Sequence, residues 1–136
     1  MIVLDFIKSE LALFSLKLSS KPNGREGVDF LIGYHQLHLK SIDLDTTKRS
    51  IKITKKDLGE LKDNLFIALV LIIDKESKVV YLIPSEDLSQ VDSNIFIDNE
   101  VSLMPSLSNW ELRVSSNTIP ELAKYTLENM VDKLKT

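Results

Sequence analysis

The chain has 136 residues, with 43% hydrophobic and 27% charged content, values that suit one globular domain with a single core. It has no cysteine, which excludes disulfides, thiolate zinc sites and cysteine nucleophiles, and its two histidines disfavour an all-protein zinc site. The net charge is −3, so contact with nucleic acid would need a local basic surface rather than the charge of the whole molecule.

A helix is expected at the N-terminus, where apolar residues recur at helical spacing: Val3, Ile7, Leu11, Phe14 and Leu18. This segment carries an acid within its apolar run and has neither a basic leader nor a cleavage site, so it does not resemble a signal peptide. The most apolar run, residues 65–73, is far shorter than the ~20 residues of a membrane-spanning helix. We therefore expect a cytoplasmic protein with no membrane segment.

Three strands in succession are expected next, over residues 28–34, 36–44 and 49–53, after a loop that contains Pro22-Asn23-Gly24. Their succession favours an antiparallel meander. A capping pattern at Thr54-Lys55-Lys56-Asp57 then predicts a short helix.

Residues 65–73 have no polar alternation, which is typical of a central strand covered on both faces. A polar turn and a strand over residues 78–83 follow, and weaker strands are expected over 93–99 and 110–114. A capping box at Thr118-Ile119-Pro120-Glu121 predicts the start of a C-terminal helix. The apolar stripe of that helix indicates that it packs on the sheet.

The second predicted strand carries a polar row, which is Gln36, His38 and Lys40. Side chains alternate across a strand, so these three share one face while the intervening leucines point to the other. Asp29 lies one short hairpin upstream, with the turn near Gly33 and Tyr34, and is expected to face Lys40 across the strand pair.

The order of elements and three motifs resemble the PD-(D/E)xK nuclease superfamily, and within it short bacterial domains of uncertain role. The motifs are Gly27-Val28-Asp29-Phe30, His38-Leu39-Lys40-Ser41 and Tyr81-Leu82-Ile83-Pro84-Ser85, and the resemblance covers roughly residues 1–88. It implies a restriction-endonuclease-like core that binds or cleaves nucleic acid. We therefore expect residues 1–136 to form one nuclease-like α+β domain, with a mixed central sheet flanked by the N-terminal and C-terminal helices.

The resemblance also implies roles for individual residues. Asp29 would be the first metal ligand, His38 stands where the superfamily has its second acid, and Lys40 would orient or activate the attacking water. Glu10 on the first helix is an additional candidate ligand. The ion would be Mg²⁺ or Mn²⁺, and the imidazole of His38 favours manganese, because magnesium prefers hard oxygen ligands. His38 is also a candidate for a base that acts without metal. The missing second carboxylate favours weak or lost catalysis.

Each of these residues also has an ordinary structural explanation. Asp29 would pair with Arg25 or cap the turn, His38 would be a half-exposed sheet residue, and Lys40 would be a solvated surface lysine. Basic residues cluster over 48–62 among interleaved acids, which indicates either a solvated face or an edge that contacts phosphates.

Two functions therefore stay open. The spacing from Asp29 to Lys40 favours a nuclease-superfamily protein that acts on or binds nucleic acid. The acidic net charge and the absent second acid favour a non-enzymatic interaction module, such as an immunity or regulatory protein that binds a partner protein.

Overall fold

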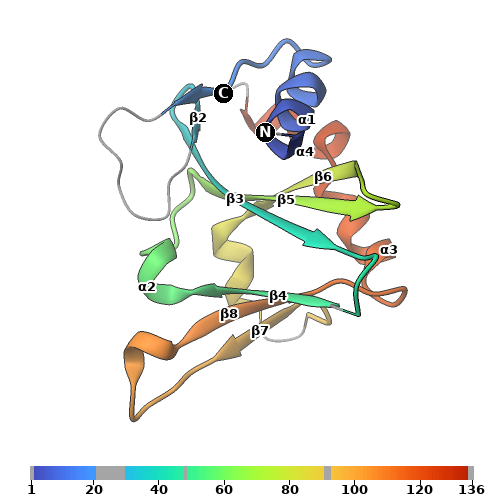
Figure 1. Cartoon of the computed structure of the whole chain (residues 1–136). Coiled ribbons are helices and arrows are strands. Elements are labelled where there is room, and N and C mark those ends of the chain that lie inside the picture. Colours follow the sequence, from blue (N-terminus) through green and yellow to red (C-terminus); the bar gives the residue numbers. More distant parts are fainter. Residues whose placement is uncertain (1, 21–29, 48, 91–92, 135–136) are drawn as a thin grey trace.

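The computed structural model has three layers: helices, a five-stranded sheet and a three-stranded sheet (Figure 1). It describes four ranges of the chain: residues 2–20, 30–47, 49–90 and 93–134. An α+β fold with a mixed sheet, as the sequence predicts, is confirmed. Within the described ranges, every helix is too short or too polar to cross a membrane.

The five-stranded sheet is organised around its most apolar strand. Its strands, in spatial order, are β1 (Ser19–Ser20), β2 (Phe30–Ile32), β3 (His35–Asp43), β5 (Leu65–Ile73) and β6 (Glu76–Pro84). β3 and β5 run parallel, and the other neighbouring pairs are antiparallel. Residues 65–71 of β5 are all buried, so the predicted central strand is confirmed.

The three-stranded sheet consists of β4 (Ser50–Thr54), β8 (Asn109–Arg113) and β7 (Phe96–Asn99), all antiparallel. The prediction that residues 49–53 complete a meander with the two strands before them is therefore wrong. β5 pairs with β3 instead, because a strand that is apolar on both faces buries the most apolar surface when it lies inside a sheet. β4 has an exposed Lys52 between Ile51 and Ile53, which suits a strand of an outer sheet.

The first and last helices, α1 (Ile2–Ala12) and α4 (Leu127–Leu134), lie on the side of the five-stranded sheet away from the three-stranded sheet (Figure 1). The predicted C-terminal helix is not continuous. It is divided into α3 (Ile119–Leu122), the 3₁₀ turn η3 (Ala123–Tyr125) and α4, because Thr126 is extended and pairs with Tyr81 at the edge of β6.

The remaining short helices are α2 (Lys55–Leu58), η1 (Ser85–Ser89) and η2 (Pro105–Leu107). The capping prediction for α2 is confirmed, because the Thr54 hydroxyl accepts a hydrogen bond from the backbone N–H of Asp57 at 3.3 Å. The helix ends at Gly59, whose φ of 80° is in the region that favours glycine.

Leu69 is the most direct test of the central strand, since it is fully buried in the middle of β5. We expect Leu69→Ala to lower the free energy of unfolding by about 2–5 kcal/mol, through lost burial and the cavity it leaves, and Leu69→Asp to unfold the domain. Chemical denaturation measures both. Leu103→Ala is the matched control, because Leu103 is 94% exposed. Equal, small effects of Leu69→Ala and Leu103→Ala would contradict the placement of β5.

Candidate functional site

The polar row lies on the strand where the sequence predicts it. β2 and β3 form a hairpin in which Ile32 pairs with His35, so Gly33 and Tyr34 make a two-residue turn. Gly33 has a φ of 58°, which glycine adopts without strain at the first position of such a turn. The predicted hairpin and its turn are thus confirmed.

The direction of the polar row follows from the register between β3 and β5. His38 lies opposite Ile67, and Lys40 opposite Leu69, so these side chains share one face of the sheet. The opposite face contributes Phe66 to a pocket that α4 also lines. Since α4 covers that opposite face, the polar row points toward the three-stranded sheet (Figure 1).

The structure brings only some of the candidate residues together. His38 is buried, at 7% exposed, and Lys40 is half-buried two positions further along the same face. Glu10 lies apart from His38 and Lys40: together with Val80 and Leu127 it lines a groove between α1, β6 and α4. Asp29, and with it the predicted contact to Lys40, falls outside the described residues. His38 is more buried than the half-exposed sheet residue considered from the sequence.

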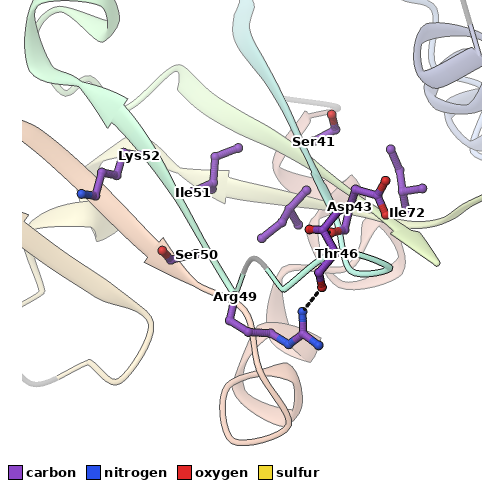
Figure 2. Close-up of a pocket in the computed structure, with 9 residues that line it drawn as sticks. Ser41, Asp43, Thr46, Arg49, Ser50, Ile51, Lys52 and Ile72 are labelled. Carbon is purple, nitrogen blue, oxygen red and sulfur yellow. Dashed lines mark hydrogen bonds between the residues drawn. The ribbon is translucent and has the colours of Figure 1, made fainter. Parts of the chain in front are cut away.

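A pocket of about 650 Å³ opens beside the end of the polar row (Figure 2). Its lining comes from the end of β3, the β3–β4 connection, β4 and β5: Ser41, Ile42, Asp43, Thr46, Arg49, Ser50, Ile51, Lys52 and Ile72. We call it the β3–β4 pocket. Ile42 follows Lys40 on the same face of β3, about 7 Å further along the strand. Lys40 thus precedes the pocket on this strand and is not among its lining residues.

The chemistry of the β3–β4 pocket is mixed. Arg49 and Lys52 supply positive charge, and three hydroxyl groups are also present, while Asp43 is the one carboxylate among its lining residues. Figure 2 shows the Arg49 guanidinium turned toward Thr46, whose carbonyl oxygen accepts its hydrogen bond at 2.8 Å. Arginine, lysine and hydroxyl side chains are the usual contacts to phosphate oxygens.

Lys55, another basic residue of the 48–62 cluster, is engaged with acids. Lys55 lies 2.6 Å from both Asp98 and Glu100 and 4.4 Å from the centre of the Trp110 ring. Desolvation lowers the pKa of Lys55, but the hydrogen bonds to the two acids outweigh it, so the pKa is raised overall. Lys55 therefore does not add to the basic edge that was expected to contact phosphates over residues 48–62. It packs against the β7–β8 hairpin instead.

One wall of the pocket, the β3–β4 connection, is held by Asp45. Its two carboxylate oxygens accept hydrogen bonds from the backbone N–H groups of Asp74 and Lys75, each at 2.8 Å. Asp74 and Lys75 form the β5–β6 turn with positive φ angles of 54° and 64°, a conformation that non-glycine residues rarely adopt. These bonds, chiefly the one from Asp74, lower the pKa of Asp45.

Three comparisons were made with known proteins: a scan against family models, a search of curated proteins and a search of solved structures. None of them found a match to this chain. The resemblance to a nuclease superfamily thus stays a hypothesis.

Sequence reasoning missed most of the pocket's lining. Ser41 belongs to the His38-Leu39-Lys40-Ser41 motif, and Arg49 and Lys52 belong to the basic cluster over residues 48–62, but no sequence pattern assigns a role to Asp43 or Thr46. The available signal was the turn composition of residues 43–47 directly after the polar row. Nothing local showed that β4 leaves the sheet and opens the space that these residues line.

Asp45 gives a pH-dependent prediction. Because the pKa of Asp45 is lower in the folded protein, its hydrogen bonds stabilise the fold fully at pH values above its pKa in the unfolded chain, ~3.9. This stabilisation is lost as the pH falls through the lower pKa of the folded state. We expect Asp45→Asn to lower the melting temperature at neutral pH, and the difference from the native protein to disappear in acid. Glu60→Gln removes another exposed carboxylate and serves as control. The same pH profile in both variants would contradict the bracing role of Asp45.

Proposed function

We propose that this chain is a nuclease-like protein whose β3–β4 pocket binds the phosphate backbone of nucleic acid. Its catalytic activity is weak or lost. The observation that carries this proposal is the pocket itself, which Arg49, Lys52 and hydroxyl side chains line at the end of the strand that holds Lys40. Local positive charge is what backbone contact requires, even in a protein of net negative charge.

The connectivity of the strands supports the same proposal. A helix, α1, precedes an antiparallel hairpin, β2–β3, and a crossover through α2 leads to β5 parallel to β3. This chain order of helix, strands, helix and buried strand is the one on which the resemblance rests, although β4, the third of the predicted strands, lies in the other sheet. A restriction-endonuclease-like core is therefore part of the proposal. Fold alone does not determine activity, so the proposed function depends on the side chains of the pocket.

Among the candidate metal ligands, the structure does not bring Glu10 and His38 together. Of the four residues considered, the structure describes His38, Lys40 and Glu10, and it places Glu10 on a helix that packs against β6 rather than beside β3. No group of three acidic or histidine side chains in the described ranges is arranged to hold a metal ion. The His38 imidazole is a softer ligand than the carboxylate that magnesium prefers.

Binding is tested with fluorescein-labelled single-stranded and duplex oligonucleotides by fluorescence anisotropy over a range of salt concentrations. We expect dissociation constants on the order of 10⁻⁴–10⁻⁶ M that weaken as salt rises. Arg49→Ala and Lys52→Ala should each weaken binding across all sequences and reduce the salt slope by about 1. Lys8→Ala, on the exposed face of α1, is the matched control. Equal effects of Lys52→Ala and Lys8→Ala would overturn the proposed site.

Catalysis has a separate test. We expect a labelled oligonucleotide to stay intact after incubation with the protein and magnesium, with at most slow cleavage in manganese, because the second acid position holds His38. Denaturing gel electrophoresis measures this. Fast cleavage that Lys40→Ala abolishes would show an active enzyme and contradict the proposal that catalysis is weak or lost.

A partner-binding role is the second candidate, and one feature favours it. The β7–β8 connection exposes Leu103, Met104 and Leu107, at 94%, 55% and 53%. The Ser108 hydroxyl accepts a hydrogen bond from the Val101 N–H at 2.9 Å, which joins the two ends of this apolar tip. Contiguous exposed apolar groups are typical of protein contacts. Leu103→Asp separates the two roles: it should leave oligonucleotide binding unchanged if the β3–β4 pocket is the site.

A further inference from the structure

A second pocket, of about 610 Å³, lies on the opposite face of the five-stranded sheet from the polar row. Carboxylates dominate its charged lining, which is Asp63, Glu86, Asp87, Asp132 and Lys133. These side chains come from the loop before β5, from η1 and from α4. Because acids outnumber the single lysine, the pocket has a negative potential. We call it the acidic pocket.

His35 forms part of the wall of the acidic pocket and is only 6% exposed. Both of its ring nitrogens are buried, and neither has a hydrogen-bond partner among the described residues. A neutral imidazole always carries one N–H donor and one nitrogen acceptor, and buried polar groups in folded proteins nearly always find partners. The imidazole therefore marks a place where a hydrogen-bonding ligand is expected.

Aromatic rings surround this imidazole. The Tyr34 ring centre lies 5.1 Å from that of His35, and the Phe66 ring centre lies 5.6 Å from it at a near-perpendicular angle. Tyr34 is 64% exposed, so its ring stands at the mouth of the pocket. Its hydroxyl donates a hydrogen bond of 3.5 Å to Asp63. An aromatic face beside carboxylates is a setting that attracts organic cations.

We propose that the acidic pocket binds an organic cation that carries an ammonium or guanidinium group. Such a group is found on a lysine or arginine side chain of a polypeptide and on a small free amine, and both sources share the chemistry that the pocket recognises. A bare metal ion fits less well, because the carboxylates in the described part of the chain are too dispersed to supply three ligands to one ion. A pocket of this size suits a larger cation.

The lining residues divide into two roles. Glu86 and Asp132 are exposed, so they pair with the cation at the mouth. Asp87 accepts a hydrogen bond from the Tyr125 hydroxyl at 2.7 Å, which fixes its carboxylate in place. In the proposed complex, a ring nitrogen of His35 accepts a hydrogen bond from the cation. This site is separate from the β3–β4 pocket and does not depend on the function proposed for it.

The test uses arginine amide as the probe and the ¹⁵N resonances of the His35 imidazole as the readout. We expect saturable shifts of those resonances at constant ionic strength. Glu86→Gln combined with Asp132→Asn should weaken binding about tenfold, equivalent to ~1.4 kcal/mol. Glu128→Gln, a charge change on the same helix outside the acidic pocket, should leave the affinity unchanged.

A second titration with a tetra-arginine peptide distinguishes the two sources of the cation. Binding at least about tenfold tighter than arginine amide indicates a polypeptide ligand, because neighbouring contacts add to the affinity. Equal affinity per guanidinium indicates a small free amine. Two results would overturn the proposal: His35 resonances that do not change with either probe, or an equal loss of affinity in the double variant and in Glu128→Gln. Oligonucleotide binding should be no weaker in the double variant, so failure here does not affect the function proposed for the β3–β4 pocket.

Discussion

Burial of β5 on both faces is the constraint on which the rest of the structure depends. Residues 65–71 have no exposed side, so one layer must cover each face of the sheet they lie in. The helices α1 and α4 lie on one side and the three-stranded sheet on the other (Figure 1). By pairing with β3, β5 also displaces β4 into the second sheet, and the β3–β4 pocket opens where the two strands diverge.

The parts of the fold that depend on local sequence could be predicted, and the parts that depend on distant partners could not. The apolar run of β5, the turn at Gly33 and the cap at Thr54 are each set by a few neighbouring residues. The pairing of β4 with β8 joins segments some sixty residues apart, and no local pattern specifies it. The break at Thr126 likewise depends on a distant contact, its pairing with Tyr81.

The candidate site shows the same division. The shared face of the polar row could be predicted, because alternation along one strand fixes it. The layer that this face meets could not be predicted, because it depends on where α4 and the three-stranded sheet lie. The pocket could not, because Ser41 and Ser50 reach it from strands that belong to different sheets. Asp45 bridges from the β3–β4 connection to the β5–β6 turn, which links the pocket wall to the central strand. The two faces of the five-stranded sheet thus differ in chemistry: a basic pocket beside the polar row, and an acidic pocket under α4.

The most direct test of the proposed function is where on the molecule nucleic acid binds. Titration of the ¹⁵N-labelled protein with an unlabelled oligonucleotide, followed by amide chemical shifts, locates the contact without any substitution. We expect the largest shifts at Ser41, Thr46, Arg49 and Ser50, which line the β3–β4 pocket. Shifts confined to residues 103–107 at the apolar tip, or no shifts at low salt, would contradict nucleic-acid binding at this pocket and favour the partner-binding function.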